Sequence, residues 1–336
     1  MGRRPDEGAP GAGRGCPQRG GRHRQRPLDG NALVLGTADL EEEAAVLVVL
    51  GVWLRSLRHA GRLRLTDVAR PGVSAPTLHR WETGRAADPS LVRELLASYG
   101  VADEEIEWMI SQLPPRDPGS RERAARRSYQ MFCDWGGKLA RARYEAVNRA
   151  ASEVIEFGSV LLPASIRTPG YDAVVAGPGV CRESGPMTGF PGQRRVVLVD
   201  EAVLYRPVAA DHSVLYRQLS HLLALLDREH PHPDVRGGLR VRVVPMDAAP
   251  RPFQDVGPLV RMTLLGRELL CRPGQAPSYL VGEALEAEHA ESLKGAARSL
   301  GRQASQAAVA RAKAHLLSVH GGLPASAGEA AGGAPR

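Results

Sequence analysis

A short segment between residues 64 and 85 carries side chains suited to contact with double-stranded DNA. Arg80 offers the forked donors that bind a guanine edge in the major groove, and Thr77 and His79 can assist it. Arginine and threonine donors that flank this stretch suit backbone phosphates. The expected phosphate contacts are Arg64, Thr66 and Arg85, and the remaining expected DNA contacts are Ser74, Ala75, Pro76, Thr77, His79 and Arg80.

A helix-turn-helix would position these side chains, because its second helix lies in the major groove. Gly72 suits the turn between the two helices, and Val73 can fill the space beneath it. Ser74 is a good N-cap for the second helix, whose first turn tolerates the proline that follows. Leu78 and Trp81 are three residues apart and therefore face the core. The sequence thus predicts a recognition helix that begins after Ser74.

Glycine and proline divide residues 40–113 into about five short helices, which predict a compact bundle. An apolar run at 44–54 is too short for a bilayer, which needs about 20 residues, so we expect a buried helix face. The run follows three glutamates rather than positive charge, which excludes a signal peptide. We therefore expect a cytoplasmic protein without a membrane segment.

The charge of the chain favours a polyanionic partner without requiring one. Its 336 residues carry 44 basic and 37 acidic side chains, and only three of the basic residues are lysine. Arginine favours forked binding of phosphate, but an arginine-rich genome would give the same composition. Four scattered cysteines indicate neither a disulfide framework nor a zinc site. We expect no metal and no cofactor.

Composition divides the chain into five parts. Residues 1–38 are rich in arginine, glycine and proline and are expected to form a disordered basic arm. Residues 39–113 are expected to form the helix-turn-helix domain, and a proline-rich stretch opens a linker over 114–143. Residues 144–300 are expected to form a second domain for sensing or interaction, and 301–336 an alanine- and glycine-rich tail.

Apolar runs in the second domain predict a mixed α/β or α+β fold. The expected strands lie at 196–199, 239–245, 259–265 and 278–281, and the expected helices at 144–157, 213–228 and 283–300. The expected fold class is thus α with mixed α/β: a five-helix, repressor-like bundle followed by an α+β domain.

Residues 57–69 and 72–85 resemble the helix-turn-helix of phage-repressor-like regulators of the xenobiotic-response-element (XRE) family. The resemblance implies that Arg58 and Glu82 form a buried, structural ion pair. It also implies that Gly84 ends the recognition helix in the left-handed conformation, which only glycine adopts cheaply.

The chain departs from the pattern of that family in its two turns. One residue is missing before Gly72, where Pro71 replaces the usual core leucine, and Arg62 stands where the first turn usually has glycine. Ala75 and Pro76 also offer no hydrogen bonds at the start of the recognition helix. These departures leave Arg80 as the best candidate for base contact.

Several segments of the second domain resemble the C-terminal domain of actinobacterial antitoxin-like regulators. They are residues 154–157, 161–163, 168–171, 199–207, 218–223 and 241–245. The resemblance implies a DNA-binding regulator whose C-terminal domain senses a ligand or binds a small companion protein, and it implies no catalytic residue. A dimer is expected, because such regulators commonly read two-fold symmetric sites. The alternative is an antitoxin-like interaction protein that mainly binds the companion, with a weakened helix-turn-helix.

Signals for an enzyme are weak. Asp200 and Glu201 are adjacent at the end of a strand and point to opposite faces if the strand continues, which is poor geometry for paired acid and base. His230, His232 and Asp234 could ligate a metal, but their alternation with proline is more typical of a surface loop. No phosphate-binding loop or nucleophile elbow is present. We expect a protein that is not an enzyme.

Overall fold

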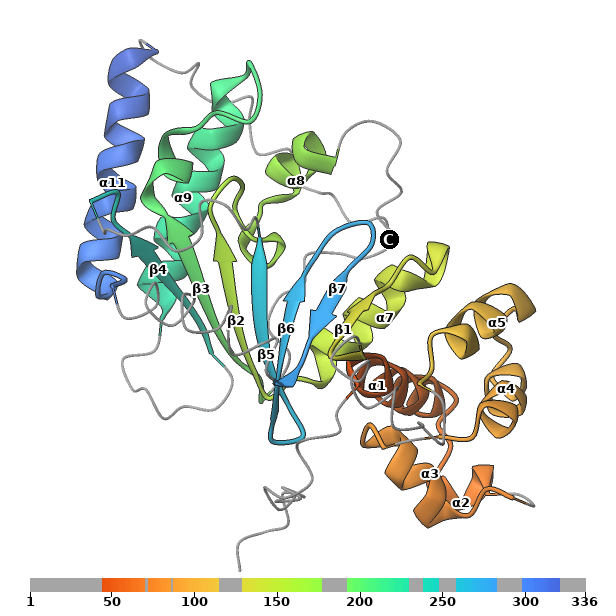
Figure 1. Cartoon of the computed structure of the whole chain (residues 1–336). Coiled ribbons are helices and arrows are strands. Elements are labelled where there is room, and N and C mark those ends of the chain that lie inside the picture. Colours follow the sequence, from red (N-terminus) through yellow and green to blue (C-terminus); the bar gives the residue numbers. More distant parts are fainter. Residues whose placement is uncertain are drawn as a thin grey trace, which may run out of the picture. The chain divides into compact units, whose positions relative to one another are not determined.

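The computed structural model describes residues 44–69, 72–85, 87–114, 129–176, 192–229, 238–247, 258–282 and 298–320 (Figure 1). The basic arm expected at 1–38 and the histidine pair at 230–232 therefore lie outside the described residues. Within the described ranges, no helix is long and apolar enough to cross a bilayer.

Five helices occupy the described residues between 44 and 114, as the glycine and proline breaks predicted. They are α1 (Ala45–Ala60), α2 (Leu65–Val68), α3 (Ala75–Glu82), α4 (Pro89–Ser98) and α5 (Asp103–Ser111). The starts of α3 and α4 are fixed by Ser74 and Asp88, whose side chains accept hydrogen bonds from backbone N–H groups of the first turn. The expected N-terminal helical bundle is confirmed.

The described strands form one seven-stranded mixed sheet with the order β1-β7-β6-β5-β2-β3-β4. They are β1 (Met131–Cys133), β2 (Glu153–Gly158), β3 (Arg194–Asp200), β4 (Leu239–Val244), β5 (Leu259–Leu264), β6 (Arg267–Arg272) and β7 (Ser278–Leu280). Strands β2, β3 and β4 are parallel, whereas every pairing from β2 through β5, β6 and β7 to β1 is antiparallel. The expected mixed α/β character of the C-terminal part is confirmed.

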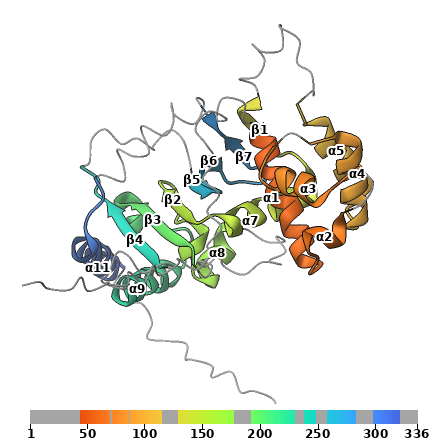
Figure 2. The ribbon, with the colours of Figure 1, turned by 90° about the horizontal axis from the view of Figure 1, so that it is seen from below.

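Helices cover the parallel half of the sheet. The described helices after β1 are α7 (Gly137–Ala150), α8 (Pro169–Ala176), α9 (His212–Arg228) and α11 (Arg302–Val319), with 3-10 turns η2 (Ala164–Ile166) and η3 (Glu201–Tyr205). Figures 1 and 2 show α9 and α11 side by side next to β3 and β4. Leu219 and Leu222 of α9 pack there with Val241 of β4 and Ala308 and Ala312 of α11. These side chains form the core of this half.

The linker expected at 114–143 is wrong for its second half. Residues 131–133 form β1, an edge strand paired with β7, and α7 begins at Gly137. A strand of three residues is too short to show an alternating pattern, and its partner lies far away in the sequence. The helix expected at 144–157 lies seven residues earlier in the chain, because α7 spans Gly137–Ala150 and β2 begins at Glu153.

The tail expected at 301–336 is wrong for residues 302–319, which form α11. Ala308, Ala312 and Leu316 recur every four residues on the buried stripe of this helix. The small alanine side chains allow α11 to approach α9 closely. In the sequence, however, a segment rich in alanine resembles a low-complexity tail. Residues 321–336, and 283–297 of the expected closing helix, lie outside the described residues.

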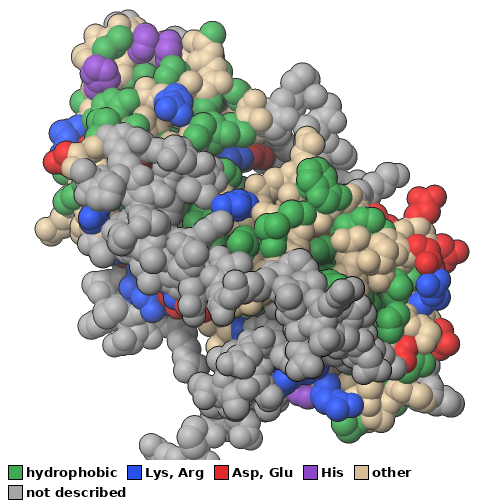
Figure 3. All heavy atoms as spheres, in the orientation of Figure 1, with side chains coloured by type: hydrophobic (Ala, Val, Ile, Leu, Met, Phe, Trp, Pro, Cys, Tyr) green, Lys and Arg blue, Asp and Glu red, His purple; other side chains and the backbone are tan. Residues whose placement is uncertain are grey.

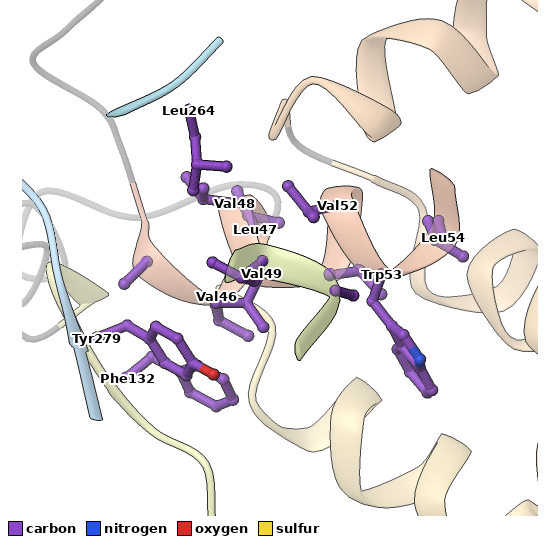
Figure 4. Close-up of a cluster of buried hydrophobic side chains, with 14 of the residues drawn as sticks. Val46, Leu47, Val48, Val49, Val52, Trp53, Leu54, Phe132, Leu264 and Tyr279 are labelled. Atoms are coloured by element: carbon purple, nitrogen blue, oxygen red, sulfur yellow. The ribbon is translucent and has the colours of Figure 1, made fainter. Parts of the chain in front are cut away.

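Helix α1 is buried around its whole circumference over its first ten residues, Ala45–Leu54. It contacts α3 in the helix-turn-helix and also α7, β1 and β7. Figure 4 shows Phe132 and Tyr279 of the sheet beside Val46 and Val49 of α1. Apolar residues on every side of a helix are typical of a helix that is buried on every side. One hydrophobic cluster is therefore shared by the helical part and the sheet.

Candidate nucleic-acid interface

The recognition helix α3 begins at a well-formed N-cap. The Ser74 hydroxyl oxygen accepts a hydrogen bond from the backbone N–H of Thr77 at 3.2 Å, and the two hydroxyl oxygens lie 2.9 Å apart. Pro76 stands in the first turn, where no intrahelical partner for its nitrogen is needed. The hydroxyl of Thr77 is therefore already hydrogen-bonded to Ser74. To bind a base, Thr77 must make a second hydrogen bond or give up the first.

The two faces of α3 differ in burial. Leu78, Trp81 and Glu82 are buried, as expected for the inner face of the first two. Ser74, Pro76 and Arg80 are exposed, and Ala75, Thr77 and His79 are partly exposed. All six expected groove contacts thus lie outside the core, at the start and along the outer face of one helix.

Charge is segregated on this part of the molecule. In Figure 3, basic and histidine side chains lie together over α3, while most acidic side chains of the helical part lie over α4 and α5. The acidic group includes Asp103 and Glu104, both exposed in the first turn of α5. A polyanion is attracted to the side that presents α2 and α3 and is repelled from α5.

Arg64, expected to contact phosphate, lies before α2 and is paired with Asp67. Its Nη2 lies 3.1 Å from Asp67 Oδ1, and the Arg64 side chain is 84% exposed. The hydrogen bond that Arg64 donates to Asp67 raises the pKa of Arg64, and the same bond lowers the pKa of Asp67. Because an exposed ion pair of this kind contributes little free energy, a phosphate can replace Asp67 as the partner of Arg64 or bind Arg64 together with it. The exposed Thr66 hydroxyl also lies 3.5 Å from Asp67 Oδ1.

Two glycines with positive φ shape the ends of the recognition helix. Gly72 has φ +86° directly before the buried Val73, and Gly84 has φ +81° after α3. The backbone N–H of Arg85, which is partly exposed, donates to Arg80 O at 3.0 Å and closes the helix end. The shortened turn at residues 70–71 lies outside the described residues.

Arg62 adopts the left-handed conformation, with φ +55°, in the turn after α1. This conformation costs a side-chain-bearing residue about 1–2 kcal/mol relative to the right-handed one. We expect Arg62→Gly to raise the free energy of unfolding by about 0.5–1 kcal/mol, after allowance for the greater freedom of glycine in the unfolded chain. Urea unfolding followed by circular dichroism measures the change. Arg62→Lys keeps the strain and should leave stability unchanged; an equal gain from lysine contradicts the conformational explanation.

Arg58 and Glu82 brace the C-terminal end of α3 against the C-terminal end of α1. Arg58 donates from Nε to Glu82 Oε1 at 2.6 Å and from Nη2 to Oε2 at 2.8 Å. Its Nη1 donates to the backbone oxygen of Leu63 at 2.8 Å, which also fixes the turn after α1. The hydrogen bond with Glu82 raises the pKa of Arg58 by more than burial lowers it. Bidentate geometry of this kind sets the orientation of the recognition helix.

Gly51 of α1 is a packing residue that the sequence did not reveal. A Cβ atom at Gly51 would lie 2.3 Å from the backbone oxygen of Trp81 in α3. The two helices therefore cross with their backbones nearly in contact, which only glycine permits. A glycine inside an apolar helical run is the one sequence signal for such a crossing, and it is a weak one.

Arg143 of α7 connects the sheet to the helical part and was also missed. It is fully buried, donates to both carboxylate oxygens of Asp134 at 2.7 Å, and donates to Glu105 of α5 at 3.2 Å. Its guanidinium lies 5.0 Å from the ring centres of both Trp53 and Trp108. The arginine thus lies between two aromatic rings of the helical part and is held by carboxylates from both parts.

The carboxylates considered for catalysis have structural partners. Asp200 accepts from the backbone N–H of Ala202 at 2.8 Å and caps η3. Glu201 accepts from the N–H of Met246 at 3.2 Å and pairs with Arg311 at 3.4 Å. Among the described residues, no group of three or more acidic, histidine or cysteine side chains could hold a metal ion.

Residues 49–109 match the sequence model of a family described as a helix-turn-helix domain. The matched segment runs from the second turn of α1 into α5 and includes both α2 and α3. No curated protein and no solved structure matches the chain. The helical part of this protein is therefore a helix-turn-helix domain of the DNA-binding type.

Proposed function

We propose that this chain is a sequence-specific transcriptional regulator of the phage-repressor-like (XRE) type, which binds double-stranded DNA through the outer face of α3. The observation that carries the proposal is the exposure of Arg80 on a helix whose inner face and end are locked by Leu78, Trp81 and the Arg58–Glu82 pair. Preorganised donors on a rigid helix are what base recognition requires.

Each expected contact has a role in this proposal. Arg80 binds a guanine edge, and Thr77 and His79 support it, while Arg64 and Arg85 fix the register through phosphates. Residues 1–38 add sequence-independent contacts with phosphate, and the C-terminal part, which comprises the seven-stranded sheet and its helices up to α11, senses a ligand or binds a partner, as in antitoxin-like regulators. A homodimer places two copies of α3 in successive major grooves of a two-fold symmetric site.

The test is selection of binding sites from random DNA, followed by titration of the recovered site at several salt concentrations. We expect Arg80→Ala to cost about 1–3 kcal/mol and to flatten preference at one base position. Arg85→Ala should weaken binding to all sequences alike and lower the salt slope by about one.

The matched control is Arg93→Ala, which removes another exposed arginine, from α4. Because Arg93 lies outside α2 and α3 and pairs with Glu107 of the acidic helix α5, affinity and preference should stay as in the wild type. Unchanged base preference in Arg80→Ala would overturn the assignment of Arg80, and recovery of no enriched sequence would overturn the regulator itself.

A second function is favoured by two observations at the same surface. Asp67 partly neutralises Arg64, and the first two residues of α3, Ala75 and Pro76, have no hydrogen-bonding side chains. Both features suit an antitoxin-like interaction protein whose helix-turn-helix binds DNA weakly while the C-terminal part holds a small companion protein. The selection experiment separates the two, because this alternative predicts no enriched site and no effect of Arg80→Ala.

A further inference from the structure

A cavity of about 460 Å³ opens beyond the C-terminal end of β2. Strand β2 has a parallel neighbour, β3, on one side and an antiparallel neighbour, β5, on the other. The walls come from the loop after β2, from η2, from the start of β5 and from the residues that follow β6. This volume is in the range of small-molecule sites, which often lie beyond the carboxyl ends of parallel strands.

Most of the lining is apolar, and its charged groups are already paired. Glu156 is 4% exposed and binds both the fully buried Arg195 and the hydroxyl of Ser165. Arg167 donates to the backbone oxygen of Leu162 at 2.6 Å and to Asp172 at 3.2 Å. Because Glu156 and Arg167 both have partners within the protein, neither needs a charged group of a ligand, and the lining favours an uncharged occupant.

Two hydroxyl groups of the lining have unused hydrogen-bonding capacity. Among the described residues, the buried Ser159 oxygen has no hydrogen-bond partner. The Tyr144 oxygen accepts from Asn148 Nδ2 at 3.4 Å, and among the described residues no group accepts its proton. Burial raises the pKa of Tyr144, so the phenol keeps that proton and can donate it. Buried polar groups without partners in a roomy site indicate a missing polar atom.

We propose that this cavity binds an uncharged, mainly apolar small molecule whose carbonyl or hydroxyl group bonds the Tyr144 and Ser159 hydroxyls, and that this molecule is an effector of DNA binding. The effector role rests on the proposed regulatory function, whereas occupancy of the cavity does not.

Helix α7 connects the cavity with the DNA-binding helices. Tyr144 lines the cavity, and the preceding Arg143 is held by Glu105 of α5 between Trp53 and Trp108. Tyr144 is also connected through Asn148 and Arg195 to Glu156, another lining residue. In this proposal α7 can take two positions, and an occupant that bonds Tyr144 binds more tightly to one of them. The occupant then changes the affinity for DNA by as much as its own affinity differs between the two positions.

Fluorescence titration of the full chain with prodan, a neutral naphthalene ketone, tests occupancy. We expect saturable binding of one molecule with a blue-shifted emission. Two variants add bulk to the lining: Ala164→Trp at an exposed residue of the wall and Val260→Phe at a buried one. Each should weaken prodan binding by about tenfold or more, because it fills part of the cavity. Tyr144→Phe should weaken it by about three- to tenfold, because one hydrogen bond is lost. If Val260→Phe does not fold, Ala164→Trp alone decides.

The matched control is Leu317→Trp, which introduces the same side chain at an exposed position of α11 outside the cavity. It should bind prodan like the wild type. Absence of saturable binding, or equal binding by Ala164→Trp and the wild type, overturns the site.

A second titration measures affinity for the selected DNA site with and without saturating prodan. We expect a change of about fivefold or more in the wild type and none in Ala164→Trp. An unchanged affinity in the wild type overturns the effector role while the site stands. Failure of the chain to bind any DNA defeats the proposed function and the effector role together, and the prodan titration is unaffected.

Discussion

Replacing Arg143 with leucine is expected to lower the free energy of unfolding by about 3–5 kcal/mol, the cost of leaving a buried partner charge unpaired. The partner is Asp134, whose side chain is completely buried and accepts two hydrogen bonds from the guanidinium. Glu105 loses its ion pair as well, at 3.2 Å. Urea unfolding of the full chain, followed by circular dichroism and by tryptophan fluorescence, measures the loss.

Arg143 is stable in this place because its charge is matched on every side. Burial alone would lower its pKa, but the hydrogen bonds and charges of Asp134 and Glu105 raise it above the usual value. The rings of Trp53 and Trp108 add their negative faces at 5.0 Å. Leucine fills part of the volume but supplies none of these partners.

Two controls isolate the unpaired charge. The double variant Arg143→Leu/Asp134→Leu removes both charges and should recover the larger part of the lost stability. Arg141→Leu, two residues earlier in α7, removes an exposed arginine paired with Glu145 and should cost less than about 1 kcal/mol. A loss for Arg143→Leu no larger than that for Arg141→Leu contradicts the structural role.

The recognition segment could be predicted because its signals are local. Gly72, Ser74 and Gly84 act within one or two turns of where they stand, and the structure gives them the positive φ values and the N-cap that their types indicate. Leu78 and Trp81 show their common face through spacing alone. The five helices between 44 and 114 follow from the same kind of evidence.

The connection between the two parts could not be predicted, because it depends on residues distant in sequence. Arg143 resembles any surface arginine of an amphipathic helix until Trp53 and Asp134 are brought around it. The apolar stripe of 44–54 indicates burial but not that the sheet covers the side opposite α3. Strand β1 could not be predicted from the sequence either, because only its pairing with β7 defines it.

Arg58→Leu is expected to have the second large effect, lowering the free energy of unfolding by about 3–5 kcal/mol. Glu82 is 3% exposed and would keep its carboxylate without the bidentate partner, and Leu63 O would lose a donor. DNA affinity should fall too, because the end of α3 is no longer fixed to α1. Arg55→Leu, one turn earlier on the same helix and exposed, should leave both quantities nearly unchanged.

A double variant identifies Glu82 as the source of the loss. Arg58→Leu/Glu82→Leu leaves no buried carboxylate without its bidentate partner, so it should recover the larger part of the lost stability. Urea unfolding of the wild type and of both variants, followed by circular dichroism, measures the recovery. A double variant as unstable as Arg58→Leu would assign the loss to the other contact of Arg58, its hydrogen bond to Leu63 O.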